Sequence, residues 1–404
     1  MTVLSDAWQF PATVKSLFMA GTVAIAAIAS AACDVAQVHV MTRNVYDGID
    51  YQGRFSPGTQ DLAKALRDTL ADITATDPVA RAALHASQIA REHPDLLAIQ
   101  EAVQLDGNPP VDMLSALVME LAKLGKPYKI IVKMKGLDTG SGAKLLDTGT
   151  GNPILDTGSG SPIRISIWDA ILVRSDLPPH DRVVNDIKQG LYTLSVNPVT
   201  IQGIARGSDP NNVTQEFAYM NLRRNWMFVD MQLHGHAFRF VTTHLDIDMA
   251  PTPQRQSGEL LEAVGNTRLP VIVAGDFNDE YKNYSKLAAA DYRDAWIEGG
   301  GATCCQDDDG ATWGQYPKTS PWTRTKKIDL ILLRGGVSAT SARLVGAMAP
   351  PCSPQGCTLL ASDHAGVVAG LVFTSTINFH PVWLLIAIGG MLLFAGLLLG
   401  VPTN

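Results

Sequence analysis

The stretch Val271-Ile-Val-Ala-Gly-Asp-Phe-Asn-Asp279 predicts a buried strand that ends in polar side chains. Its first four residues are apolar and mostly β-branched, which is typical of a strand hidden on both faces. We expect Gly275 to end the strand, and Asp276 and Asn278 to point the same way, because side chains alternate along extended chain. Oxygens and amide donors at a strand edge suit a divalent cation or a phosphate. An ordinary Asx turn explains the same residues about as well.

Strands and helices are expected on both sides of this stretch, in mixed order. A loop-rich region spans 185–215, with a strand near 191–196. The helices are expected at 60–92 (two helices that meet near Thr76-Asp77-Pro78), 112–123 and 253–264. The other strands are expected at 38–44, 95–100, 165–174, 226–233, 238–244, 328–333 and 366–372. This mixture, with a hairpin at 234–237, predicts an α/β sandwich of two sheets rather than a purely parallel sheet.

Residues 137–163 are three tandem nonapeptides that each begin with Leu-Asp-Thr-Gly. Asp-Thr-Gly also occurs at aspartic protease sites, but three copies at fixed spacing indicate a repeat expansion. A weak calcium-binding array of turns is an alternative. We interpret the repeat as a flexible insertion between two strands.

The two ends of the chain predict export and membrane attachment. Lys15 precedes an uncharged run of apolar and small residues at 16–32, so 1–33 is expected to be a signal peptide or N-terminal anchor. Cys33 is then either removed or lipidated. Residues 382–400 are apolar throughout and long enough to cross a bilayer as a transmembrane helix. The expected location is extracytoplasmic and membrane-anchored.

Charge and cysteine content narrow the function. The 404-residue chain has 18% charged residues and a formal net charge of −7, which gives no support to broad attraction for nucleic acid. A local basic groove, at Arg223-Arg224 or Lys326-Lys327, stays open. The late cysteines lack zinc-site spacing and suggest disulfides in an exported protein: Cys304, Cys305, Cys352 and Cys357.

Polar side chains also end the other predicted strands. Each alone has a bland interpretation, as a solvated carboxylate, a hydrogen-bonded interior histidine or a turn. Their repetition over more than 300 positions is harder to dismiss. The residues are Asn44, Glu101, His244, Asp276, Asn278, Asp329, Asp363 and His364.

The motifs that contain these residues resemble the endonuclease/exonuclease/phosphatase superfamily, and the resemblance covers residues 36–373. The six motifs stand in family order: Met-Thr-Arg-Asn-Val-Tyr, Leu-Ala-Ile-Gln-Glu, Thr-Thr-His-Leu-Asp, Ala-Gly-Asp-Phe-Asn, Lys-Ile-Asp-Leu-Ile-Leu and Ser-Asp-His. The resemblance implies a four-layer α/β sandwich of two mixed sheets flanked by helices, here with a C-terminal transmembrane helix added. The chain departs from the family at Arg43, where a Trp is usual, and at Asp169, where an Asn is usual. A second Glu and a Tyr that assist catalysis in nuclease members have no clear counterpart.

The resemblance implies a metal site and a catalytic site. Glu101 would bind Mg²⁺, helped by Asn44 and by Asp363 through water, with Mn²⁺ or Ca²⁺ as alternatives; few carboxylates plus water suit Mg²⁺. His364 would be the general base, oriented by Asp329.

Three more residues would act on the phosphate. Asp276 and Asn278 would hold the phosphate or the nucleophile, and His244 would donate to a phosphoryl oxygen or assist the leaving group.

The sequence therefore predicts an exported, membrane-tethered, metal-dependent phosphoesterase. Its substrate is expected to be a lipid head group or a nucleic acid, so an extracellular nuclease is the alternative to a lipid phosphodiesterase. No protein partner is implied. A catalytically inactive surface-binding module on the same fold is the alternative of another class, and it predicts gaps among the catalytic positions.

Overall fold

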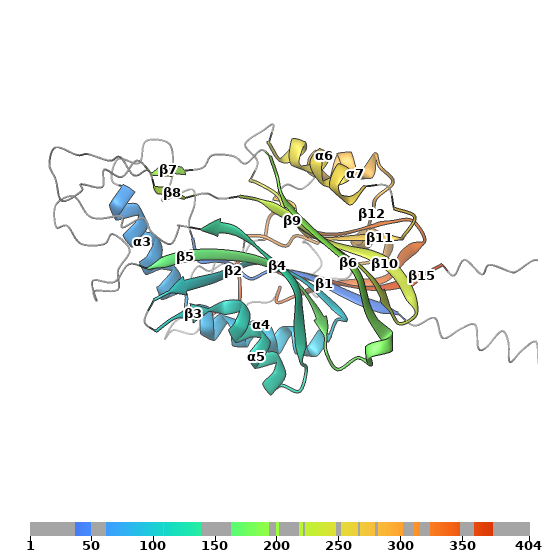
Figure 1. Ribbon diagram of the computed structural model, residues 1–404, viewed down its shortest axis with the longest axis horizontal. Helices are drawn as coiled ribbons and strands as arrows, with labels where there is room; N and C mark the ends of the chain where they lie inside the picture. Colours follow the sequence, from blue (N-terminus) through green and yellow to red (C-terminus); the bar gives the residue numbers. More distant parts are fainter. Residues whose placement is uncertain are drawn as a thin grey trace, which may run out of the picture. The chain divides into compact units, whose positions relative to one another are not determined.

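The computed structural model describes residues 37–49, 62–107, 109–138, 163–193, 199–201, 218–220, 223–247, 252–265, 267–278, 282–301, 310–314, 324–347 and 359–374. The chain divides into two compact units, Met1–Phe373 and Thr374–Asn404. The helices and strands given below all lie in the first unit (Figure 1).

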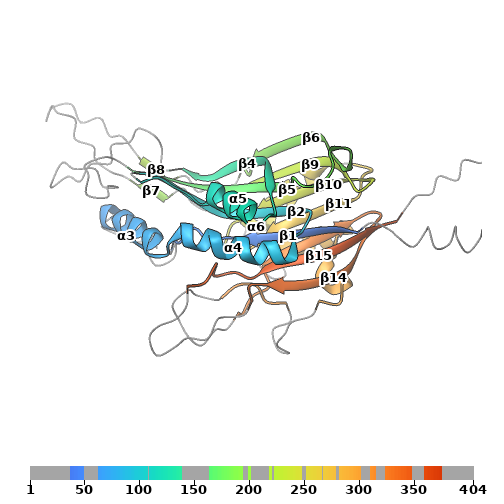
Figure 2. The ribbon, with the colours of Figure 1, turned by 90° about the horizontal axis from the view of Figure 1, so that it is seen from below.

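A seven-stranded mixed sheet forms one half of this unit. β1 runs parallel to β2 and antiparallel to β15, so the sheet contains both kinds of pairing. Its edges are β14 and β4 (Figure 2). The strand order is β14 (Val337–Val345), β15 (Gly366–Phe373), β1 (Val38–Asn44), β2 (Leu96–Asp106), β5 (Arg164–Arg174) and β4 (Tyr128–Asp138), and β3 (Val111–Asp112) pairs with β2.

A six-stranded mixed sheet forms the other half. Only β10 and β11 pair in parallel here. The order is β12 (Arg293–Asp294), β13 (Asp329–Arg334), β11 (Val271–Asp276), β10 (His236–His244), β9 (Asn225–Leu233) and β6 (Arg182–Leu191). A separate pair consists of β7 (Val199–Ile201) and β8 (Ala218–Met220).

Two of the long helices begin directly after an aspartate whose side chain caps them. Asp77 accepts a hydrogen bond from the backbone N–H of Ala80 and precedes Pro78, the first residue of α4. Asp112 caps α5 in the same way through Ser115. The helices are α3 (Leu62–Ala75), α4 (Pro78–Glu92), α5 (Met113–Lys123), α6 (Thr252–Val264), α7 (Lys282–Ala288), α8 (Ala295–Glu298) and the 3₁₀-helix η1 (Pro179–Asp181).

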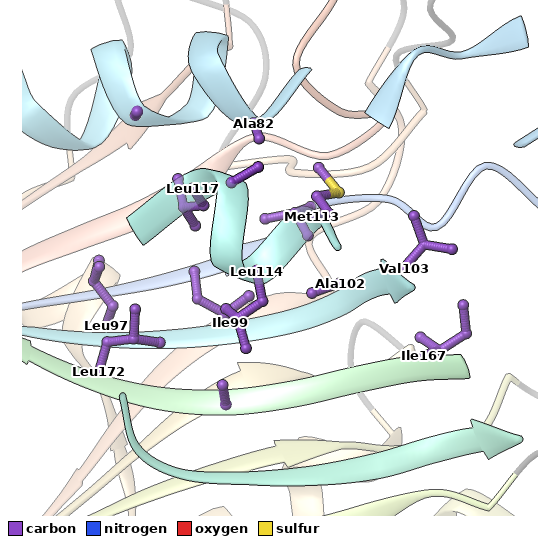
Figure 3. Packing of buried hydrophobic residues seen from close by; sticks show 14 of the residues in the cluster. Ala82, Leu97, Ile99, Ala102, Val103, Met113, Leu114, Leu117, Ile167 and Leu172 are labelled. Atoms are coloured by element: carbon purple, nitrogen blue, oxygen red, sulfur yellow. The ribbon is translucent and has the colours of Figure 1, made fainter. Parts of the chain in front are cut away.

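Three hydrophobic clusters hold the layers together. The first lies between the seven-stranded sheet and α3, α4 and α5, where Leu114 and Leu117 face Leu97 and Ile99 (Figure 3). The second fills the space between the two sheets. The third packs α6 and α7 on the six-stranded sheet, on the opposite side from α4 and α5 (Figure 1). Burial of apolar side chains in these clusters, at roughly 25 cal/mol per Å², is the main stabilising contribution.

The predicted α/β fold with two mixed sheets flanked by helices is confirmed. Of the strand predicted near 191–196, Leu191 ends β6, 192 and 193 are not in a strand, and 194–196 lie outside the described residues. The loop-rich region predicted at 185–215 is wrong at its start, because 185–191 belong to β6. The sequence predicts no strand at β14, whose small and polar residues weaken the alternating apolar signal. The nonapeptide repeat joins β4 to β5, and Leu137 and Asp138 of its first copy belong to β4.

Several predictions from the sequence fall outside the described residues. These are the signal or anchor at 1–33, the repeat at 139–162, the transmembrane helix at 382–400 and the late cysteines. Within the described part of the chain, no helix has the length and apolar character needed to cross a bilayer.

Candidate active site

Strand register brings the predicted site residues to one edge of the two sheets. His244 ends β10 opposite Asp276, which ends the parallel strand β11. Asp329 begins the antiparallel strand β13 and also lies opposite Asp276. In the facing sheet, Asn44 ends β1 beside Gln100 of β2. A hydrogen bond of 2.9 Å from Asn44 Nδ2 to Asp276 Oδ2 joins the two sheets at this edge.

The prediction that Gly275 ends its strand is wrong, because β11 continues through Asp276. A Cβ at this position would lie 2.1 Å from the carbonyl oxygen of Thr243 on β10. Only glycine allows the two backbones to approach this closely. Its role is therefore to keep Asp276 in register with His244.

The sequence left two interpretations of Asp276 and Asn278 open, an Asx turn and a site for a cation or phosphate. The two carboxylate oxygens of Asp276 fit one interpretation each. Asp276 Oδ1 accepts from the backbone N–H of Asn278 at 2.8 Å, which is an Asx turn. Asp276 Oδ2 faces the site, where Asn44 donates to it. Asn278 has a φ of 52°, so strand alternation does not set its direction; its Nδ2 donates to the carbonyl of Leu245 instead.

His364 and Asp329 form a buried pair. The distance from His364 Nδ1 to Asp329 Oδ2 is 2.7 Å. Thr312 Oγ1 accepts from the backbone N–H of Asp329, and the backbone N–H of His364 donates to Ser362 Oγ. Burial lowers the pKa of His364, but the charges of Asp329 and Asp363 outweigh burial and hold this pKa well above its ordinary value.

Asp363 lies beside this pair, with its Oδ1 3.9 Å from His364 Nε2. Burial raises the pKa of Asp363 to about 6, and the charges of Glu101 and Asp276 act in the same direction. Those charges mark a crowded acidic site. Such crowding is what a bound cation would relieve.

Glu101 occupies a β-bulge inside β2 rather than the end of a strand, which corrects the prediction. The pairing of β2 with β5 shifts register between Ile99 and Ala102, and Glu101 has a φ of 63°. Its backbone N–H donates to Asp169 Oδ1 at 3.1 Å, and its Oε2 accepts from the backbone N–H of Asp47 at 3.3 Å. A bulge re-aims a side chain, and here it turns Glu101 toward His244.

His244 lies at the centre of a charged cluster. Its Nε2 is 3.5 Å from Glu101 Oε1 and 3.6 Å from Asp276 Oδ2. Its Nδ1 is 3.7 Å from Asp169 Oδ1. The Nη1 of the buried Arg224 lies 2.7 Å from His244 Nε2 and 2.9 Å from Nδ1.

Two groups of side chains offer ligand atoms within 4.8 Å of one another: Glu101 with His244 and Asp276, and Asp276 with Asp329 and His364. Both consist of carboxylates and imidazole, which fit a divalent cation. In the second group a cation would displace the hydrogen bond that orients His364, the base expected from the sequence, whereas in the first group it would displace the contact of Arg224 with His244. The first group is therefore the better candidate. Asn44 touches it through Asp276, whereas Asp363 belongs to neither group.

Three residues of this site were missed as site residues from the sequence. Asp169, noted only as a departure from the family, accepts hydrogen bonds from the Glu101 backbone and from Asn225 Nδ2 at 2.6 Å. A lone carboxylate inside the apolar strand β5 was the signal that could have identified it. Arg224 was noted only as part of a possible basic groove, and Asn225 carried no signal of its own.

Comparison with known proteins places the chain in a family. The model of the Endonuclease/Exonuclease/phosphatase family matches residues 60–364. A mannosyl-6-phosphatase from Bacteroides thetaiotaomicron VPI-5482 is similar in structure, with a TM-score of 0.50 at 14% identity over 83% of this chain and 100% of that one.

A second structure supports the same fold. An endonuclease/exonuclease/phosphatase family protein from Bacteroides thetaiotaomicron has a TM-score of 0.51 at 12% identity, over 84% of this chain and 99% of that one. Among curated proteins, none matches this sequence. The extent of the family match shows that the chain belongs to the endonuclease/exonuclease/phosphatase family.

Proposed function

We propose that the chain is a metal-dependent phosphoesterase that hydrolyses its substrate with a water molecule activated by His364. The observation that carries the proposal is the 2.7 Å contact between His364 and Asp329, beside an Asp276 carboxylate that also borders Glu101 and His244. A base and a cation site that share one carboxylate are what hydrolysis of a phosphoester needs. All eight predicted residues are present at this edge, which favours an enzyme over an inactive binding module.

His364 is suited to remove a proton from water. The Nδ1–H of its neutral form donates to Asp329 Oδ2, which leaves Nε2 as the acceptor. The negative charge of Asp329 then stabilises the imidazolium that forms, consistent with the raised pKa of His364. His364 Nε2 lies 3.9 Å from Asp276 Oδ2, so the proton is accepted beside the proposed cation site.

Glu101, His244 and Asp276 are the residues that would hold the cation, and Asn44 orients Asp276. A divalent cation bound there would supply Lewis-acid stabilisation of charge on the phosphoryl oxygens. We propose Mg²⁺, as predicted from the sequence, with Mn²⁺ and Ca²⁺ as alternatives. Arg224, which Asp246 holds through a buried ion pair of 3.5 Å, places a guanidinium next to His244, where it can donate to an anionic phosphoryl group.

A nuclease is the second candidate, and one surface feature favours it. Trp168 on β5 is partly exposed, with Lys133 Nζ 4.3 Å and Lys135 Nζ 5.0 Å from its ring centroid. Trp168 pairs with Ala102, the residue after Glu101, so this patch adjoins the site. Aromatic rings flanked by cations bind single-stranded nucleic acid by stacking and charge.

The test is turnover by the full-length purified protein with Mg²⁺ or Mn²⁺, and with EDTA. The substrates are double- and single-stranded DNA, sphingomyelin in detergent micelles, inositol phosphates and a sugar phosphate. We expect metal-dependent hydrolysis of at least one of them, abolished in His364→Gln and retained in His180→Gln. His180 is a matched control because its side chain is 81% exposed. Absence of metal-dependent turnover on every substrate would refute the proposed function.

Export and membrane attachment complete the proposal, and they rest on the sequence of 1–33 and 382–400 alone. A lipid substrate accords with a tether close to a membrane. Cell fractionation, followed by protease treatment of intact cells, tests the location. Recovery of full-length protein in the soluble cytoplasmic fraction would contradict it.

A further inference from the structure

Arg81, in the first turn of α4, is a completely buried arginine behind the active site. Its Nε and Nη2 donate to the carbonyl and hydroxyl oxygens of Thr76. Its Nη1 donates to the carbonyls of Val45 and Tyr46 at 2.7 Å each and lies 3.4 Å from the carbonyl of Ala361. One guanidinium therefore contacts three separate segments of backbone.

Two of these segments carry site residues. Val45 and Tyr46 directly follow Asn44, which donates to Asp276. Ala361 directly precedes Ser362, Asp363 and His364. We call residues 45–47 the first loop and 361–364 the second loop. The second loop also contacts the residue that precedes the first loop, since Ser362 Oγ donates to the carbonyl of Asn44 at 2.9 Å.

The first loop needs an external restraint. Tyr46 has a φ of 62°, which is uncommon for a residue other than glycine. Such a conformation persists only where its surroundings enforce it. Arg81 restrains Tyr46 in two ways. It donates a hydrogen bond to the Tyr46 carbonyl, and its guanidinium lies over the Tyr46 ring, 5.2 Å from the ring centroid.

Arg81 carries a positive charge close to the acidic side chains of the site but forms no ion pair with any described carboxylate. Among the described residues, no carboxylate lies within 4.0 Å of its guanidinium, whose acceptors are backbone carbonyls and a hydroxyl. Burying a cation is costly unless charge and hydrogen bonds compensate it. Here the compensation comes from carbonyl oxygens and, at longer range, from Asp363, Asp47 and Glu101, whose charges oppose the lowering of the pKa of Arg81 by burial.

We propose that Arg81 is a positioning residue, which holds the first and second loops in the arrangement that lets Asn44 reach Asp276 and His364 reach Asp329. The inference rests on the proposed function for its catalytic consequence. Lysine cannot replace it, because one ammonium lacks the planar fork that reaches all three segments at once.

Arg43 provides a matched control. It is as deeply buried as Arg81 and also contacts α4. Its guanidinium donates to His85 Nδ1, Gln88 Oε1 and the carbonyl of Val345, not to either loop. Removal of this guanidinium also disturbs a buried network, but one that reaches the first loop only through His85, whose Nε2 lies 3.4 Å from the carbonyl of Val45.

The experiment compares full-length wild type, Arg81→Lys, Arg81→Met and Arg43→Met. Amide hydrogen exchange is measured for Val45 and Tyr46 in the first loop and for Asp363 and His364 in the second loop. Mn²⁺ binding is measured by electron paramagnetic resonance. We expect exchange at both loops in the two Arg81 variants to be at least tenfold faster than in wild type, with unchanged exchange in β10 and β11. We also expect Mn²⁺ to bind at least tenfold more weakly. Arg43→Met should lose thermal stability while keeping loop exchange and Mn²⁺ affinity within threefold of wild type.

Two results would overturn the inference: loop exchange and Mn²⁺ affinity at wild-type levels in a folded Arg81 variant, or the same changes in Arg43→Met. Arg81→Lys keeps the charge, so it provides the measurement if Arg81→Met does not fold. Neither readout depends on turnover. If wild type hydrolyses no phosphoester, the proposed function fails while the positioning role is still judged by exchange and Mn²⁺ binding.

Discussion

The two histidines of the site, His364 and His244, are both buried and both close to Asp276, yet their surroundings differ. His364 makes one short contact, with Asp329 at 2.7 Å, and the carboxylates of Asp276 and Asp363 lie farther away, at 3.9 Å. His244 has three carboxylates at 3.5 to 3.7 Å and a guanidinium nearer than any of them. A histidine with one oriented partner suits proton transfer, whereas one inside a cluster of charges suits holding a cation or an anion.

The largest effect should come from removal of the base. In His364→Gln we expect kcat to fall by about 10²- to 10⁴-fold, the usual contribution of a general base. Thermal unfolding should show that the variant is folded, and Mn²⁺ binding should stay close to wild type. A kcat within a few-fold of wild type would show that His364 is not the general base, so that the two histidines could not be assigned different roles.

The pH profile tests the partner of the base. Because the charge of Asp329 raises the pKa of His364, Asp329→Asn should lower this pKa and move the acidic limb of the kcat/KM profile to lower pH. At the optimum we expect about a 10²-fold loss, since the imidazole is no longer oriented or stabilised as a cation. An acidic limb that stays in place, or moves to higher pH, would show that His364 does not titrate in that limb.

His244→Gln should act mainly on the metal. We expect the Mn²⁺ concentration for half-maximal activity to rise by about 10- to 100-fold, the range found for residues that support metal sites. The acidic limb of the pH profile should not move. If His244→Gln and His364→Gln changed metal dependence equally, the two histidines would have to share one role.

Arg224→Met tests the cation beside His244. We expect kcat/KM to fall by about 10- to 100-fold, because a charge-assisted hydrogen bond contributes roughly 1.5–3 kcal/mol. The adjacent Arg223 is exposed and serves as the matched control, as Arg223→Met. An equal loss in both variants would indicate general surface charge rather than a contact within the site.

Asp169→Asn should have the smallest effect. The new amide oxygen can accept from the Glu101 backbone, as Asp169 Oδ1 does. Its nitrogen would face Asn225 Nδ2, but Asn225 Oδ1 has no hydrogen-bond partner in the described part of the chain, so Asn225 can rotate and accept. We expect a change of less than about threefold in kcat, since both hydrogen bonds of about 1 kcal/mol are kept. Asp169→Leu, which keeps neither, should lose far more activity.

The predicted site residues could be singled out because each follows, precedes or begins a strand that the sequence predicts from its apolar pattern. Asn44, His244, Asp276 and Asp329 are at strand ends in the structure, as expected. Glu101 was found although its position was misjudged, because a bulge cannot be read from the apolar pattern of β2. Asp169 and Arg224 were missed as site residues because their importance comes from neighbours on other strands.

The sequence by itself determined the α/β class, the boundary between two helices near Asp77-Pro78, and the family, since these depend on local periodicity, the chemistry of helix starts and short motifs. Only the tertiary structure decided which histidine makes a short hydrogen bond to a carboxylate, how the bulge aims Glu101, and that Arg81 reaches both site loops. Those features join residues tens to hundreds of positions apart. The physical reason is that register between strands and the direction of a buried side chain depend on packing, which no local pattern encodes.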